Sequence, residues 1–200
     1  MEKGKVIFLN GASSSGKTTL ANNLRLSLEE PYLYLGLDTF ITMLPLGYIG
    51  QVPPADQCMQ LIPFVDKEGH NQVELKYGPK GRILIKSMYE TVRILANNGW
   101  NVICDDVCFE LQEVAKILDR LEVILISVYA PLTVLEEREL ARKNRLPGLA
   151  RWQFPKMYPS NPIYDLEIDT SKGSIEESVQ AIKEFLKNGK PAAFKKIKSS

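Results

Sequence analysis

The chain has 200 residues, of which 44% are hydrophobic and 24% are charged, and its formal net charge is +1. These values are typical of a globular protein and exclude a mainly disordered or collagen-like chain. Because the net charge is close to zero, no overall field attracts nucleic acid or an anionic membrane, and we expect neither as a partner. The length indicates one domain with a small insertion.

The cysteines and the start of the chain favour a cytoplasmic protein. Cys58, Cys104 and Cys108 are an odd number of cysteines, which indicates buried thiols in a reducing compartment rather than a disulfide framework. A metal site at Cys104 and Cys108 would need two more ligands, and His70 is the only histidine. The first apolar run is too short for a signal peptide, and no stretch approaches the roughly 18 apolar residues of a membrane span.

Short apolar runs alternate with helical periodicity along most of the chain. The predicted strands are residues 5–10, 32–37, 101–107, 122–130 and 164–169. The predicted helices are residues 17–29, 82–97, 111–120, a helix that starts at Pro131 and runs into the arginine-rich segment 138–151, and residues 174–186. This alternation predicts an α/β fold with a parallel sheet covered by helices on both faces.

Two segments depart from this alternation. Residues 39–81 are rich in proline and glycine, and we interpret them as an insertion that is too short for a core of its own. Within the insertion, a short helix is predicted at residues 39–44 and a hairpin at residues 69–81. Residues 188–200 are basic and are predicted to form a mobile tail, which limits the domain to residues 1–187.

Residues 11–18 (GASSSGKT) match the phosphate-binding motif G-x-x-x-x-G-K-[ST]. They follow a predicted strand and open a predicted helix, so the loop amides and the positive end of the helix converge on one anion. Lys17 reaches the β- and γ-phosphates and Thr18 is a Mg²⁺ ligand in such loops. The alternative is a chance glycine- and serine-rich turn. The predicted nucleotide-binding residues here are Gly11, Ala12, Ser13, Ser14, Ser15, Gly16, Lys17, Thr18 and Thr19.

Asp38, Asp105, Asp106 and Asp169 lie at or just past the ends of predicted strands, where ligands gather in parallel sheets. Asp105 follows VIC as a Walker B acid does and is the second predicted metal ligand with Thr18. Asp106 faces the other side of the strand, and the alternative for this pair is two solvated acids. Asp38 is either a general base for a substrate hydroxyl or the N-cap of the short helix that follows it.

Three arginines follow at spacings of four and three residues, which place Arg138, Arg142 and Arg145 on one face of a continuous helix. Guanidinium groups beside a phosphate site bind its oxygens and stabilise charge in the transition state. We therefore predict a lid over residues 138–158, with Arg138 and Arg142 in catalytic roles and all three arginines in nucleotide binding. The alternative is a solvated helix face, with Glu136, Glu137 and Glu139 as local partners.

With these residues in place, the sequence resembles the chloramphenicol phosphotransferase-like family of P-loop kinases. The resemblance covers most of the chain and rests on residues 7–20 (IFLNGASSSGKTTL), LGLDTF at 35–40 with Met43 and Pro45, VICDDV at 102–107, Glu137 to Arg145, and Tyr164-Asp165 to Asp169-Thr170-Ser171. The downstream proline after Gly-x-Asp-Thr-Phe is more specific than the phosphate loop, which is generic.

The resemblance implies a P-loop NTPase fold like that of shikimate and nucleoside monophosphate kinases, with strand order 2-3-1-4-5. It implies ATP and Mg²⁺ as cofactors, Asp38 as the base, Arg138, Arg142 and Arg145 in the lid, and adenine near residues 169–171. The segment 39–81 then lies on the acceptor side. Residues 46–81, Asn144 in the lid and the proline-rich stretch 154–162 depart from the family pattern, which leaves the acceptor open.

The function predicted from these features is transfer of the γ-phosphoryl group of ATP to a hydroxyl of a small molecule, either a chloramphenicol-like antibiotic or another metabolite. A nucleoside monophosphate kinase is less favoured because residues 30–80 contain no arginine to bind an acceptor phosphate. A GTPase-type regulator is less favoured because DKEG at 66–69 matches D-x-x-G but no N-K-x-D follows. A non-catalytic interaction role through the basic tail also remains an alternative, and the sequence gives no oligomeric state.

Overall fold

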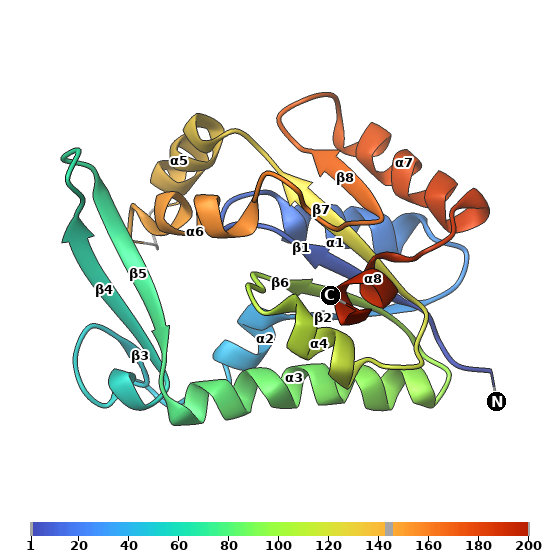
Figure 1. Cartoon of the computed structure of the whole chain (residues 1–200), viewed down its shortest axis with the longest axis horizontal. Helices are drawn as coiled ribbons and strands as arrows, with labels where there is room; N and C mark the ends of the chain where they lie inside the picture. Colours follow the sequence, from blue (N-terminus) through green and yellow to red (C-terminus); the bar gives the residue numbers. More distant parts are fainter. Residues whose placement is uncertain (1, 143–145, 200) are drawn as a thin grey trace.

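The computed structural model describes residues 2–142 and 146–199. Its main sheet has five strands in the order β2-β6-β1-β7-β8, and every neighbouring pair is parallel (Figure 1). Numbered along the chain, these five strands lie in the predicted order 2-3-1-4-5. The strands are β1 (Val6–Asn10), β2 (Tyr32–Gly36), β6 (Asn101–Asp106), β7 (Val123–Tyr129) and β8 (Leu166–Asp169).

Helices cover both faces of this sheet, as predicted, because strand side chains alternate between the two faces. Phe8 faces a cluster that includes α3 (Pro79–Asn97), α4 (Leu111–Ile117) and α8 (Ala193–Ser199). Ile7 and Leu9 face the opposite cluster, with α1 (Lys17–Ser27) and α7 (Ile175–Asn188). A capping box opens α7: Glu177 N donates to Ser174 Oγ over 3.1 Å and Ser174 N donates to Glu177 Oε2 over 2.8 Å.

The prediction of a mobile tail is wrong for residues 193–199, which form α8 and pack on the sheet (Figure 1). The Asp165 carboxylate accepts the backbone N–H groups of Ala192 and Ala193 over 2.7 and 2.9 Å, and its other oxygen accepts Leu125 N over 2.9 Å. Phe194 is buried with its ring 6.0 Å from that of Phe8. The buried residues of α8 are Ala193, Phe194 and Ile197, and lysines surround Ile197 in the sequence. The composition of the segment therefore does not reveal its apolar face.

A second, three-stranded sheet lies within the predicted insertion. Its strands are β3 (Ile49–Gly50), β4 (Met59–Val65) and β5 (Asn71–Tyr77), and β4 and β5 pair as an antiparallel hairpin from Met59↔Tyr77 to Val65↔Asn71. The hairpin predicted over residues 69–81 is therefore wrong in its limits, because β4 forms although Pro63 disfavours a strand locally. β3 pairs β4 only at Met59 and Gln60, so Pro63 lies on a free edge, where proline is tolerated.

The short helix predicted at residues 39–44 is α2 (Leu37–Ile41), which begins two residues earlier. The long helix predicted to run into residues 138–151 is wrong: α5 (Leu132–Ala141) ends before Arg142, and α6 (Leu149–Met157) is a separate helix. In Figure 1 the β4–β5 hairpin rises from the start of α3 and passes beside α6. One hydrogen bond, from Val73 N to Gly148 O over 3.1 Å, joins the hairpin to the residue before α6.

The packing of α8 gives a test of the corrected C-terminus. Replacing Phe194→Ala removes a buried ring from the core cluster around Phe8, and such changes cost about 3 kcal/mol or more. We expect a clear decrease in the free energy of unfolding, measured by urea denaturation. Lys195→Ala, at an exposed neighbouring position on the same helix, is the control and should change stability by less than about 0.5 kcal/mol. Equal effects of the two variants would contradict the docking of α8.

Candidate active site

The phosphate loop joins β1 to α1 through two left-handed residues. Ser14 has φ 65° and Gly16 has φ 93°, and alternation of this kind turns successive backbone N–H groups into one concavity. A Cβ on Gly11 would lie 2.3 Å from Val128 O, so only glycine fits where the loop begins. Gly16 is the N-cap of α1, and the first turn of this helix contains no acid. The loop therefore has the local geometry of an anion site.

Lys17 points back along the loop rather than into solvent. It is 8% exposed, and its Nζ donates to Ala12 O over 3.0 Å. The same Nζ lies 4.0 Å from Asp105 Oδ1. A buried ammonium in this position provides a fixed positive charge for a phosphate bound above the loop.

Asp105 and Thr18 lie together, as the sequence predicts for the two metal ligands. Thr18 Oγ1 donates to Asp105 Oδ2 over 2.7 Å, and Tyr34 OH donates to the same oxygen over 3.0 Å. Carboxylate and hydroxyl oxygens are the donors that Mg²⁺ prefers, so these side chains fit that ion. The sequence analysis did not find Tyr34, which lies in an apolar strand; burial and the Asp105 carboxylate raise the pKa of its hydroxyl.

Asp106 is buried on the other side of β6, and its partners differ from those of Asp105, as predicted. Its carboxylate accepts hydrogen bonds from Tyr89 OH and, over 2.7 Å, from Val107 N. Burial raises the pKa of Asp106 to about 6, against the lowering effect of these two donors. The alternative of two solvated acids is wrong, because Asp105 and Asp106 are only 5% and 3% exposed.

Asp38 lies in the first turn of α2, and Gly36 is the N-cap of that helix, so the N-cap alternative for Asp38 is wrong. The Asp38 side chain is exposed and lines a small cavity over the phosphate loop with Lys17, Thr18, Asp105 and Arg142. Residues from three separate predicted strand ends therefore meet at one place, as expected for a parallel sheet.

The arginines have two different environments. The Arg138 guanidinium donates to Thr170 Oγ1 over 2.9 Å and to Thr170 O over 2.8 Å, and it approaches Ser14 O at 3.5 Å. Arg142 is exposed at the end of α5 and lines both the phosphate cavity and a neighbouring cavity of about 450 Å³ beside Thr170 and Gly173. The third predicted lid residue, Arg145, lies outside the described residues.

Glu137 is exposed, as the alternative expects, but Glu136 and Glu139 do not belong to a solvated helix face. Glu139 is 1% exposed, and its carboxylate accepts Gly148 N over 2.7 Å and Ala150 N over 3.0 Å at the start of α6. Glu136 pairs with Arg151 over 2.6 Å. These two contacts fix α6 against α5.

Two residues that the sequence analysis missed contact the phosphate loop from the region of α6. Gln153 Oε1 accepts Ser13 N over 2.6 Å, and Tyr158 OH accepts Ala12 N over 2.9 Å. Tyr158 OH also donates to Val128 O over 2.8 Å. No motif marks a lone glutamine or tyrosine 140 residues after the loop, so only the structure brings them together.

A larger cavity of about 920 Å³ adjoins the phosphate cavity, and Asp106 and Val107 line both. The hairpin and the helices α3, α4 and α6 contribute its other walls. Aromatic and charged side chains share its lining, including Tyr77, Tyr89, Phe109, Trp152, Glu74, Arg82 and Lys86. This space is large enough for a small organic molecule beside the phosphate loop.

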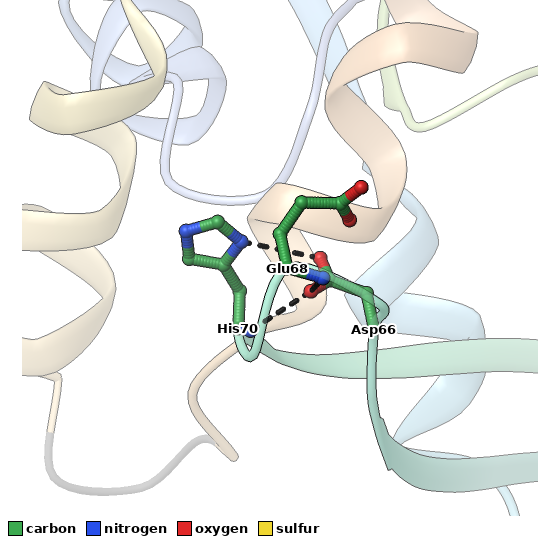
Figure 2. Close-up of side chains that lie close together, drawn as sticks. All are labelled: Asp66, Glu68 and His70. Carbon is green, nitrogen blue, oxygen red and sulfur yellow. Dashed lines mark hydrogen bonds and ion pairs between the residues drawn. The ribbon is translucent and has the colours of Figure 1, made fainter.

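The D-x-x-G match at 66–69 is the turn between β4 and β5, and it does not line the phosphate cavity. Figure 2 shows Asp66, Glu68 and His70 at this turn, with metal-ligand atoms within 4.8 Å of one another. The Asp66 carboxylate accepts the backbone N–H groups of Glu68 and His70 over 3.0 and 2.8 Å and the Gln72 side-chain amide over 2.6 Å. Asp66 therefore shapes the turn, and the contacts give no reason to assign a metal there.

The fold and the loop define a P-loop nucleotide-binding protein of the small-molecule kinase class. The family model for chloramphenicol phosphotransferase-like proteins matches residues 4–187. The chain belongs to this family, which confirms the resemblance found in the sequence, and it is an enzyme of the phosphotransferase type. A curated Mycobacterium tuberculosis protein with the provisional name O-phosphotransferase is 28% identical over 187 residues, which are 92% of this chain and 83% of the relative.

Solved structures show the same fold. The crystal structure of APE1195 matches with a TM-score of 0.64 and 26% identity, over 94% of this chain and 97% of that one. The adenylylsulfate (APS) kinase of M. tuberculosis matches with a TM-score of 0.60 and 18% identity, over 94% and 100%. A shikimate kinase from Bacteroides thetaiotaomicron matches with a TM-score of 0.59 and 18% identity, over 91% and 98%. Among the described residues, no helix is long and apolar enough to span a bilayer.

The buried position of Lys17 gives a direct test of the anion site. Replacing Lys17→Ala removes a charged donor that is worth about 1.5–3 kcal/mol to a bound phosphate, or roughly ten- to a hundredfold in affinity. We expect the dissociation constant for Mg·ATP to rise by this factor in calorimetry. Lys5→Ala changes an exposed lysine on the opposite end of the strand and should leave the affinity unchanged. Equal affinity of wild type and Lys17→Ala for Mg·ATP would show that the loop does not bind the nucleotide.

Proposed function

We propose that this enzyme transfers the γ-phosphoryl group of ATP to a hydroxyl of a small molecule. The observation that carries the proposal is the junction of two cavities: the phosphate cavity, with Lys17, Thr18 and Asp105, and the 920 Å³ cavity beyond Asp106. An acceptor in the larger space would reach a γ-phosphate above the loop without crossing solvent. The family membership supports the same reaction type.

The donor nucleotide would use the residues predicted for it. The β- and γ-phosphates would lie on the loop and against Lys17, with Thr18 and Asp105 as the protein ligands of Mg²⁺. Bound Mg²⁺ neutralises phosphate charge as the bond to the leaving group breaks. The adenine ring of the nucleotide would occupy the 450 Å³ cavity beside Thr170, which Arg138 and Arg142 also line. Arg138 would hold Thr170 against the loop through its hydrogen bonds to both. Arg142 would donate hydrogen bonds to phosphate oxygens.

Asp38 is the proposed general base. The acceptor O–H gives its proton to an Asp38 carboxylate oxygen while the oxygen attacks the γ-phosphorus. The bond between the γ-phosphorus and the bridging oxygen breaks, and ADP leaves. The position of Asp38 supports this role, because its exposed side chain lines the phosphate cavity beside Lys17 and Thr18.

The acceptor is proposed to have a planar apolar part together with its hydroxyl. Four aromatic side chains, Tyr77, Tyr89, Phe109 and Trp152, line the larger cavity and favour such a group. A chloramphenicol-like antibiotic and a comparable metabolite both meet this requirement. A phosphorylated acceptor is the second candidate, because Arg82 and Lys86 line the same cavity although no arginine lies between residues 30 and 80.

The three buried free thiols support a cytoplasmic location.

The reaction is tested by measuring ADP release with a panel of hydroxyl compounds that includes chloramphenicol and a nucleoside monophosphate. We expect at least one compound to stimulate ADP release and to gain a phosphoryl group, detected by mass spectrometry. Stimulation by the nucleoside monophosphate alone would select the second candidate. Slow hydrolysis that no compound stimulates would favour a regulatory nucleotide-binding protein instead.

The role of Asp38 is tested with Asp38→Asn, which keeps the shape of the side chain and removes its basicity. We expect turnover with the active acceptor to fall by roughly 10²- to 10⁴-fold, the usual contribution of a general base. The affinity for Mg·ADP should change little, because no phosphate is proposed to bind Asp38. Thr39→Ala, at the next exposed position of α2, is the control. Full turnover in Asp38→Asn would eliminate Asp38 as the base.

A further inference from the structure

The first half of the phosphate loop is held by side chains that are distant in the sequence. Gln153, on α6, is 1% exposed, and its Oε1 accepts Ser13 N over 2.6 Å. Tyr158, directly after α6, accepts Ala12 N over 2.9 Å. A buried amide is costly unless its hydrogen bond is made. The hydrogen bond with Ser13 N therefore holds Gln153 in place as well as the loop.

These contacts divide the loop amides into two groups. The N–H groups of Ala12 and Ser13 are used within the protein. The N–H groups from Gly16 onward lie at the start of α1, where a helix has no internal acceptors for them. The contacts from α6 therefore occupy the part of the loop next to β1 and leave the part at the helix start for an anion.

The loop needs such support because its backbone is strained. Ser14 is a non-glycine residue with φ 65°, a conformation that costs about 1 kcal/mol or more and persists only where the surroundings enforce it. Ser14 follows the residue that Gln153 holds. On its other side, Thr170 Oγ1 donates to Ser15 O over 2.7 Å. The strained residue is thus flanked by two hydrogen bonds from outside the loop.

The helix that carries Gln153 is itself fixed by several contacts. Glu139 caps its start through Gly148 N and Ala150 N, and Glu136 pairs with Arg151. Gly148 O accepts the Val73 N–H of the hairpin. Trp152, next to Gln153, lines the larger cavity. One helix therefore contacts the loop with one side chain and borders the acceptor space with its neighbour.

We propose that Gln153 is a positioning residue for the nucleotide, which holds the phosphate loop in its binding conformation before the nucleotide arrives, with Tyr158 as a second support. The inference rests on the proposed binding of a nucleotide to the loop. Without Gln153 the loop would sample other conformations, and the affinity for a polyphosphate would fall in proportion to the fraction of loops that remain competent. Folding would be affected less, because α6 keeps its other contacts.

The test compares Gln153→Met with Arg151→Met on the same helix. Each change puts methionine in place of a polar side chain and removes one hydrogen bond of 2.6 Å, but only Gln153 contacts the loop. Mg·ADP is titrated calorimetrically into each protein, and thermal unfolding is followed without nucleotide. We expect the dissociation constant to rise about tenfold in Gln153→Met and to stay within twofold of wild type in Arg151→Met, while the two melting temperatures remain similar.

Tyr158→Phe is a second variant, which removes the acceptor for Ala12 N, and a smaller loss of affinity is expected, roughly threefold, because the Gln153 contact persists. If wild type binds Mg·ADP and Gln153→Met binds it equally well, the positioning role is wrong and the proposed function stands. A loss of affinity that is the same in both methionine variants and follows their melting temperatures also overturns it, since packing of α6 would explain the result. If wild type itself binds no Mg·ADP, the proposed function fails and this inference fails with it.

Discussion

The site depends on a positive charge kept out of water at the start of α1. Lys17 Nζ lies 3.0 Å from Ala12 O and 4.0 Å from Asp105 Oδ1. Ala12 follows the end of β1, and Asp105 lies near the end of the neighbouring strand β6. The register Leu9↔Asp105 in the parallel pairing of β1 with β6 sets this distance. An ammonium held in this way costs folding energy on its own, and the polyphosphate proposed to bind beside it would offset that cost.

The same register separates two adjacent acids. Asp105 accepts hydrogen bonds from Thr18 and Tyr34 through one oxygen on the side of the loop, whereas Asp106 accepts from Tyr89 on the side of α3. Alternation along β6 therefore places the Asp105 carboxylate beside the hydroxyl groups of Thr18 and Tyr34. It places the Asp106 carboxylate in the wall between the two cavities. Asp106 is only 3% exposed in that wall, and this burial raises its pKa.

The sequence predicts those parts of the fold that depend on local pattern. The five parallel strands, their helices, the loop and the meeting of Asp38, Lys17, Thr18 and Asp105 follow from apolar periodicity and from one motif. The parts that fail depend on contacts distant in the chain. Pro63 disfavours a strand locally, yet β4 forms because its edge is free there. Phe194 and Ile197 stand among lysines in the sequence, and the contact that fixes their helix comes from the distant Asp165 carboxylate. Gln153 carries no local signal, because its partner is Ser13.

The hairpin contacts the rest of the protein both at its base beside α3 and along α6. Beyond its base at α3, the backbone bond between Val73 and Gly148 ties it to the start of α6, and its turn contacts itself through Asp66. A backbone hydrogen bond does not depend on side-chain identity. Side chains along β4 and β5 can therefore change without loss of this hydrogen bond. Because residues 74–77 of the hairpin line the 920 Å³ cavity, such changes would alter the space beside the phosphate loop.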